Sequence, residues 1–182
     1  MIDVQELWYT VLKDWAWQIE NEFVTLLRFL QEKEVKTVLE IGCYDGGTAR
    51  GFLGIGCSVI SVDIERRERV LTLEEEFPKK FKFVEMSSQE FELKKKVDVL
   101  YIDGDHGYEE VKADFNRFKD NVKPGGFIVF HDILDSELHA KQGCGVPKFW
   151  KEIKEEGDIE LIHVGESWGG IGIKIVFPCK FI

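Results

Sequence analysis

The feature that most constrains the fold is one short run, Val38 to Ala49, with the sequence VLEIGCYDGGTA. An apolar segment ends in a carboxylate and a glycine, and a pair of glycines follows at the start of the next segment. This order is typical of a buried strand, a tight turn and a helix, with a nucleotide-type ligand at the carboxyl end of the first parallel strand. Gly42 has the backbone freedom that such a sharp turn requires.

Glu40 limits the chemical class of ligand that this turn can bind. A pyrophosphate prefers backbone N–H groups and a helix N-terminus, with no carboxylate beside it. The dinucleotide fingerprint G-x-G-x-x-G is also incomplete, because Tyr44 occupies the position of its second glycine. A carboxylate instead favours a ligand with a cationic tail, such as S-adenosylmethionine, which carries an ammonium and a sulfonium. A nicotinamide-dependent oxidoreductase and an ordinary strand–turn–helix with incidental glycines remain as alternatives.

Strand and helix patterns alternate after the N-terminal region. Residues 4–32 carry apolar side chains at helical spacing and predict one or two helices, with a break near Trp17. The later patterns predict strands at 36–42, 57–64, 81–85, 97–103, 127–130, 159–164 and 171–177, and helices at 46–54, 65–76, 108–121 and 147–156. Residues 135–146 are predicted to form a loop that covers the substrate.

This alternation predicts an α/β fold with a Rossmann-like, doubly wound sheet that is mostly parallel and covered by helices on both faces. Only the short turn at 165–170 separates the last two strands, so they must pair antiparallel.

Length and charge limit the class of protein. At 182 residues the chain is predicted to form one domain, with an N-terminal helical cap at 1–34 and a core at 35–182. A formal net charge of −10 argues against nucleic acid as a partner, because phosphate binding needs a basic surface. The apolar runs are of strand length and the N-terminus lacks a signal-peptide pattern, which predicts a cytoplasmic protein without membrane association.

The cysteines and the N-terminal aromatic residues carry weaker signals. The 4 cysteines form no C-x-x-C pair and predict neither a zinc site nor a disulfide framework. The aromatic side chains near the N-terminus are compatible with packing in the core and with a substrate or homodimer surface. These N-terminal aromatic helices and residues 133–146 are expected to shape the acceptor pocket.

Polar residues follow the second and third predicted strands. Asp63 ends the second strand about twenty residues beyond the glycine loop, where a carboxylate can accept both ribose hydroxyls of an adenosine. After the third strand, Ser88 or Gln89 can reach an adenine edge. The same segment can equally begin a helix capped by Ser87 or Ser88.

A second polar group follows the fourth and fifth strands. Asp103 and His106 come after the fourth strand, and His131 and Asp132 come after the fifth. Ligands of an open parallel sheet bind outside the carboxyl ends of its strands, so these four side chains are expected to lie close together at that edge of the sheet. Two carboxylates and an imidazole can hold one divalent cation. Alternatively, His106 can act as a general base, or the aspartates can cap helices.

These motifs together resemble a class I S-adenosylmethionine-dependent methyltransferase. The resemblance is strongest to the small family that shares its pattern with sugar O-methyltransferases of macrolide biosynthesis and the so-called cephalosporin hydroxylase. It covers roughly residues 17–177. The segments that carry it are Val38–Gly42, Asp63, Tyr101–Glu109 and Lys123–Asp132.

The resemblance implies a seven-stranded sheet with an antiparallel last strand and a set of site residues. Glu40 and Gly42 would hold the methionine end of the cofactor and Asp63 the ribose. The full expected cofactor-binding set is Glu40, Gly42, Cys43, Tyr44, Gly46, Asp63, Ile64, Ser88, Gln89 and Asp103.

In metal-dependent O-methyltransferases of similar pattern, the residues matching Asp103, His131 and Asp132 bind Mg²⁺. His131 stands where those relatives have Asp, Glu or Asn. His106 stands where they often have a lysine base, so the expected catalytic residues are His106 and Asp103.

The predicted reaction is O-methylation of a small-molecule hydroxyl, on a sugar, polyketide or catechol-like acceptor. Besides the oxidoreductase, the alternative is a cofactor-binding protein that has lost catalysis. A nucleic-acid methyltransferase is disfavoured by the acidic charge and by the absence of an N/D-P-P-Y/F motif.

Overall fold

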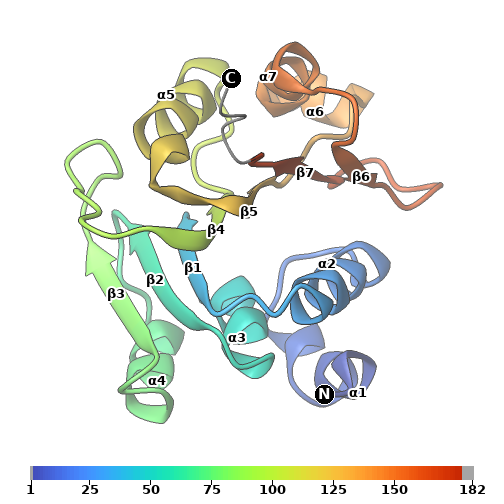
Figure 1. The fold of residues 1–182 in the computed structure, drawn as a ribbon. Helices are drawn as coiled ribbons and strands as arrows, with labels where there is room; N and C mark the ends of the chain where they lie inside the picture. The colour runs from blue at the N-terminus through green and yellow to red at the C-terminus, as the bar shows by residue number, and fades with distance from the viewer. Residues whose placement is uncertain (1, 178–182) are drawn as a thin grey trace.

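A seven-stranded sheet with the order β3-β2-β1-β4-β5-β7-β6 forms the centre of the structure, a computed structural model that describes residues 2–177 (Figure 1). The strands are β1 (Thr37–Ile41), β2 (Ser58–Asp63), β3 (Phe81–Glu85), β4 (Val97–Ile102), β5 (Val122–Phe130), β6 (Ile159–Leu161) and β7 (Ile171–Ile175). Strands β1 to β5 run parallel, and β7 is antiparallel to both β5 and β6. The predicted mixed Rossmann-like sheet is therefore confirmed.

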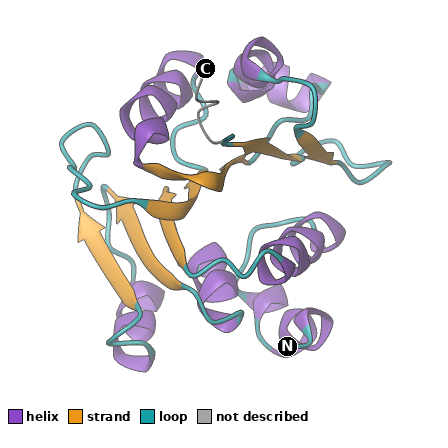
Figure 2. Cartoon of the chain, viewed as in Figure 1, coloured by secondary structure: helices purple, strands orange, loops and turns teal. Residues whose placement is uncertain are grey.

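Helices cover both faces of this sheet (Figures 1 and 2). One side carries α1 (Val4–Thr10), α2 (Glu20–Glu32), α3 (Gly47–Gly54) and α4 (Glu68–Glu76), and the other carries α5 (Tyr108–Phe118), α6 (Glu137–Gln142) and α7 (Val146–Ile153). Two 3-10 turns, η1 (Leu12–Asp14) and η2 (Lys119–Asn121), follow α1 and α5. Buried apolar side chains accordingly form two clusters, one on each face of the sheet.

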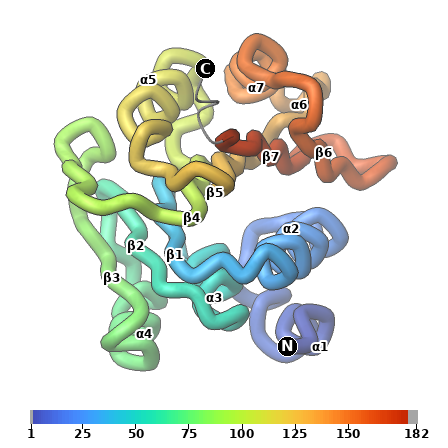
Figure 3. The backbone as a smooth tube through the Cα atoms, in the orientation of Figure 1, coloured from blue at the N-terminus to red at the C-terminus, as the bar shows by residue number. Residues whose placement is uncertain are grey.

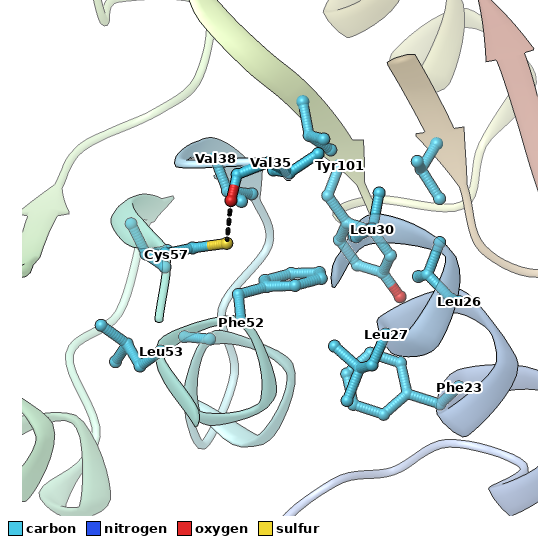
Figure 4. Packing of buried hydrophobic residues seen from close by; sticks show 14 of the residues in the cluster. Phe23, Leu26, Leu27, Leu30, Val35, Val38, Phe52, Leu53, Cys57 and Tyr101 are labelled. Carbon is cyan, nitrogen blue, oxygen red and sulfur yellow. Dashed lines mark hydrogen bonds between the residues drawn. The ribbon is translucent and has the colours of Figure 1, made fainter. Parts of the chain in front are cut away.

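The N-terminal helices belong to the core rather than lying loosely on it. Phe23 and Leu27 of α2 pack beside Phe52 of α3, which in turn contacts Tyr101 of β4 (Figure 4). The ring centroids are 5.9 Å apart for Phe23 and Phe52 and 5.3 Å apart for Phe52 and Tyr101. Buried aromatic rings contribute strongly to stability, so this cluster anchors the N-terminal region next to the end of β4.

The connection between α1 and α2 confirms the predicted break near Trp17. Helix α1 ends at Thr10 and α2 begins at Glu20. The backbone between them runs beside α3 (Figure 3). This segment therefore lies next to the loop that follows β1.

The predicted loop at 135–146 is wrong in part, because it contains α6. The Ser136 hydroxyl caps this helix by accepting from the His139 N–H at 3.2 Å, and Gly143 ends it in the left-handed conformation. Among the other predicted helices, the second begins later, at Glu68, and the last ends earlier, at Ile153.

Within residues 2–177, no helix is both long and apolar enough to cross a membrane. Cys43, Cys57 and Cys144 are free thiols, and Cys179 lies outside the described residues.

Candidate active site

A cavity of about 1110 Å³ opens at the carboxyl ends of the parallel strands. Most of the predicted site residues line it: Gly42, Tyr44, Asp63, Ile64, Ser88, Gln89, Asp103, His106, His131 and Asp132. The predicted residues Glu40, Cys43 and Gly46 do not line it. Trp17 also lines the wall, in the N-terminal region that was expected to shape the acceptor pocket. Met86, Asp114 and Trp168 line it as well, and none of these three was singled out from the sequence as a site residue.

Gly42 makes the turn off β1 at φ +85°, in the region that favours glycine. A Cβ at this position would lie 2.1 Å from the carbonyl oxygen of Asp103. The loops after β1 and β4 therefore touch through their backbones, and this contact fixes Asp103 against the cavity floor.

Asp63 organises the loop that follows this turn. Its Oδ2 accepts from the backbone N–H groups of Cys43 and Tyr44 at 2.8 and 2.9 Å. Tyr44 has a left-handed backbone with φ +48°, and the Arg67 guanidinium lies 4.0 Å from its ring centroid. The end of β2 therefore holds the glycine loop in shape while it lines the cavity.

Glu40 is fully buried behind the cavity wall. Its two carboxylate oxygens accept from the hydroxyls of Thr48 on α3 and Ser61 on β2. Burial raises the pKa of Glu40 to about 7; the two hydroxyls act in the opposite direction and the Asp103 carboxylate adds to the rise. Glu40 was expected to hold the methionine end of the cofactor; its side chain does not line the cavity.

We expect Glu40→Gln to change how stability depends on pH. The folded pKa of about 7 lies above the ordinary value of 4.5, so this carboxyl contributes stability below pH 4.5 that is lost as pH rises through 7. The full rise corresponds to about 3 kcal/mol. Glutamine does not titrate and can bond both rotatable hydroxyls. Urea unfolding at pH 5 and pH 8 should show the variant gaining stability over wild type at the higher pH.

The same substitution at exposed Glu32 on α2 is the control. If the free energy of unfolding changed by the same amount between pH 5 and pH 8 in wild type and in Glu40→Gln, Glu40 would be ionised in the folded protein at both pH values.

A cluster of two carboxylates and two imidazoles lies on the cavity wall. Asp103 Oδ1 is 3.3 Å from His131 Nδ1 and 3.4 Å from His106 Nε2. The other ring nitrogen of His106, Nδ1, is 3.2 Å from Asp132 Oδ2. His131 Nδ1 also lies 3.3 Å from Asp132 Oδ1. The structure thus brings together all four residues predicted at the ends of β4 and β5, with His106 bridging the carboxylates.

These contacts shift the pKa values of all members. Burial lowers the pKa of His131, but the carboxylates of Asp103 and Asp132 outweigh this effect and raise it to about 10. Burial raises the pKa of Asp103, yet His131 and His106 hold it below its usual range. The contact with Asp103 raises the pKa of His106 against the effect of burial. Such strongly perturbed groups in a cleft are typical of functional sites.

His139 is a neighbour of this cluster that the sequence did not single out. Its Nδ1–H donates to the Leu134 carbonyl at 2.6 Å, and its Nε2 lies 3.3 Å from Asp132 Oδ1. The Gly169 N–H donates to the same oxygen at 3.1 Å. Asp132 has φ +61°, which is rare for an aspartate, so these contacts support a strained backbone at the site. Helix α6 is what brings His139 here.

Asp114 of α5 is a second missed residue. Its Oδ1 accepts from the Ser88 hydroxyl at 2.6 Å and from Gln89 Nε2 at 2.8 Å. Both predicted adenine-side residues are therefore held by a buried carboxylate. The sequence contained a signal, because Asp114 falls between Val111 and Phe118 on the buried face of an amphipathic helix.

Asp103, His131 and Asp132 fit a divalent cation. One ligand atom from each lies within 4.8 Å of the others. Their donor set is two carboxylates and one imidazole. Mg²⁺ prefers oxygen ligands, whereas imidazole suits Mn²⁺ less strongly than it suits later transition metals and Zn²⁺. The donor chemistry therefore favours a transition metal over the Mg²⁺ expected from the resemblance.

A family model described as a methyltransferase domain matches residues 39–133. The chain belongs to this family of methyltransferases. With the seven-stranded sheet, it is a class I S-adenosylmethionine-dependent methyltransferase.

Solved structures agree with this methyltransferase fold. A putative caffeoyl-CoA O-methyltransferase from Staphylococcus aureus has a TM-score of 0.67 at 18% identity, covering 93% of this chain and 91% of that one. An O-methyltransferase from Bacillus cereus in complex with S-adenosylhomocysteine gives 0.66 at 16%, covering 97% and 91%. The N-methyltransferase NodS from Bradyrhizobium japonicum, also with S-adenosylhomocysteine, gives 0.65 at 16%, covering 96% and 99%. At these identities the likeness concerns the fold.

Curated relatives match only short parts of the methyltransferase. An uncharacterised protein of Sinorhizobium fredii is 39% identical over 57 residues, which are 31% of this chain and 6% of the relative. An uncharacterised protein of Acanthamoeba polyphaga mimivirus is 51% identical over 39 residues, which are 21% of this chain and 18% of the relative.

Proposed function

We propose that the protein methylates a hydroxyl group of a small molecule, with S-adenosylmethionine as the methyl donor. The observation that carries this proposal is the position of His106 on the cavity wall, between Asp103 and Asp132 and beyond the glycine loop. A hydroxyl is a weak nucleophile until its proton is removed, and in this position His106 would act as the base beside the methyl donor.

The cavity wall offers separate positions for the parts of the donor. S-adenosylmethionine supplies an electrophilic methyl group on its sulfonium. Asp63 would hold the ribose, with Ile64 and Met86 beside the adenine and Gly42 leaving room for the methionine end. The protein's main contribution is alignment, because near-attack geometry supplies much of the rate in such a transfer.

His106 would accept the proton of the acceptor hydroxyl. Its shorter contact is Nδ1 to Asp132 Oδ2 at 3.2 Å, and we assign the ring N–H to it. This tautomer leaves the lone pair on Nε2, which lies 3.4 Å from Asp103 Oδ1, so the acceptor hydroxyl would have to take the place of that carboxylate oxygen beside Nε2. The proton would move from the hydroxyl oxygen to Nε2 as that oxygen bonds to the methyl carbon; the S–C bond of the sulfonium breaks, its electron pair stays on sulfur, and S-adenosylhomocysteine leaves. Asp103 and Asp132 then stabilise the imidazolium.

Asp103, His131 and Asp132 would hold the divalent cation. A bound cation lowers the pKa of a coordinated hydroxyl and orients it. Trp17 and Trp168 line the same cavity and would give the acceptor apolar surface near the acidic cluster. This combination favours a neutral acceptor with neighbouring hydroxyls over an anionic one.

We expect Mn²⁺ to bind the purified protein more tightly than Mg²⁺, because His131 contributes a nitrogen ligand. His131→Ala should weaken Mn²⁺ binding at least by the roughly 10- to 100-fold that loss of an outer-sphere partner costs. His131→Asp, which replaces the nitrogen ligand by an oxygen ligand, should raise the affinity of the site for Mg²⁺. Electron paramagnetic resonance of Mn²⁺ and calorimetry check both, with His163→Ala as the control. Absence of saturable Mn²⁺ binding would mean that the trio acts as an ion-paired cluster alone.

Transfer of the labelled methyl group from S-adenosylmethionine to a panel of acceptors tests the proposal. The panel contains catechols, sugars with vicinal hydroxyls, and matched amines, each with Mn²⁺, Mg²⁺ or a chelator. Label on a hydroxyl oxygen supports the proposal. Label on amines alone, or none on any acceptor despite tight S-adenosylmethionine binding, overturns it in favour of an N-methyltransferase or a binding protein.

A further inference from the structure

We propose that Gln18, in the segment between α1 and α2, is a positioning residue that orients the Asp103 carboxylate for methyl transfer. This inference rests on the proposed function, because it concerns the same site. It assigns to the N-terminal region a role in the chemistry, in addition to its packing on the sheet.

The two oxygens of Asp103 face different groups. Oδ2 accepts from Gln18 Nε2 at 3.2 Å and from the Tyr101 hydroxyl at 3.3 Å. Oδ1 faces His131 and His106. Two neutral donors thus hold one oxygen, and this leaves the other aimed at the imidazole pair. Without Gln18, Oδ2 keeps only the Tyr101 hydroxyl, two residues before Asp103 on β4, and the carboxylate is held less firmly against rotation about its Cβ–Cγ bond.

The orientation of the Gln18 amide is fixed by charge. Reversing it would place an amide oxygen against the Asp103 carboxylate, so the nitrogen must face Asp103. In this orientation Oε1 is buried and finds no hydrogen-bond partner among residues 2–177. A buried unpaired amide oxygen is unfavourable for stability. An apolar side chain would avoid that cost, so what the amide provides here is its N–H group toward Asp103.

The segment that carries Gln18 packs against α3. Gly47 lacks a side chain, and a Cβ there would lie 2.4 Å from the Trp15 carbonyl oxygen. The Arg50 guanidinium lies 4.4 Å from the Trp15 ring centroid, and that of Arg69 lies 5.1 Å away. Arg69 also donates to the Asp14 carbonyl at 2.9 Å. These contacts tie the N-terminal segment to α3 and α4 and fix the approach of Gln18 to Asp103.

The decisive variant is Gln18→Met, which keeps the shape of the side chain and removes its donor. We expect kcat to fall roughly 10- to 100-fold, the usual effect of removing an orienting partner, with the dissociation constant of S-adenosylhomocysteine unchanged. The midpoint of urea unfolding should stay the same or rise, since the unpaired oxygen is also removed. A role in folding alone predicts the reverse pattern, with lower stability and unchanged kcat.

A spectroscopic readout separates this inference from the proposed function. The ring-nitrogen NMR shifts of His106 should change in Gln18→Met and should not change further when Gln18→Met is added to Asp103→Asn. Gln5→Met is the matched control, because the Gln5 amide also donates to a carboxylate, Glu20 Oε1 at 2.7 Å, away from the cavity.

Each combination of results has one meaning. Altered His106 shifts without methyl transfer in wild type would reject the proposed function and retain the link between Gln18 and Asp103. Unaltered His106 shifts, or equal changes from Gln5→Met, would overturn the positioning role.

Discussion

His106→Gln is expected to lower kcat for methyl transfer by a factor of about 10² to 10⁴, the range that a general base contributes. Glutamine keeps a hydrogen-bonding side chain between Asp103 and Asp132 but cannot take up the proton of the acceptor hydroxyl. The side chain of His106 is partly exposed at the cavity wall, so the substitution leaves the core intact. Single-turnover measurements with saturating S-adenosylmethionine isolate this step from product release.

The binding of S-adenosylhomocysteine separates loss of the base from loss of the site. Its dissociation constant should stay close to the wild-type value in His106→Gln. His163→Gln is the control, because His163 lies in the connection between β6 and β7, with its ring beside Asn21. A His106→Gln enzyme with wild-type kcat would exclude His106 as the base and leave activation of the hydroxyl to the cation site.

The sequence was sufficient to predict the sheet and the convergence of Asp103, His106, His131 and Asp132. Each residue follows the end of a strand whose apolar pattern is unambiguous, and parallel strands present their carboxyl ends at one edge. The apolar pattern of each strand and the rule that parallel strands end at one edge predict that these residues lie together, and the structure shows them within contact distance. No knowledge of side-chain packing was needed.

Gln18, His139 and Glu40 show what could not be predicted. Gln18 reaches Asp103 across 85 residues of sequence, and His139 reaches Asp132 only because α6 forms within a segment that was expected to be a loop. Glu40 precedes a typical glycine turn, yet its carboxylate points to hydroxyls from α3 and β2. Side-chain direction at such positions depends on the packing of other elements, which periodicity does not encode.

Gly42→Ala is expected to be the most damaging single substitution in the glycine loop. The new Cβ would lie 2.1 Å from the Asp103 carbonyl oxygen and 2.6 Å from the Gly104 Cα, both of them backbone atoms that cannot turn aside. The alanine would also have to adopt φ +85°. Strain at positive φ and overpacking together should destabilise the fold by about 3 kcal/mol or more. Relief requires the loops after β1 and β4 to separate, which moves Asp103 away from the glycine loop. Cofactor affinity and kcat should therefore fall together with stability.

Gly125→Ala separates the two causes. Gly125 has φ +82°, and a Cβ there would meet no atom within 4 Å. This substitution has only the cost of placing an alanine at positive φ, about 1 kcal/mol, and causes no collision. Gly125 lies in β5, outside the cavity wall. Urea unfolding gives the loss of stability in each variant, and the difference between the two losses measures the cost of the collision between a Cβ at position 42 and the Asp103 backbone. If the two alanines were equally destabilising, the need for glycine at position 42 would be a matter of backbone conformation alone. A larger loss for Gly42→Ala, with cofactor binding lost only there, would mean that the close approach of the two loops holds Asp103 in the site.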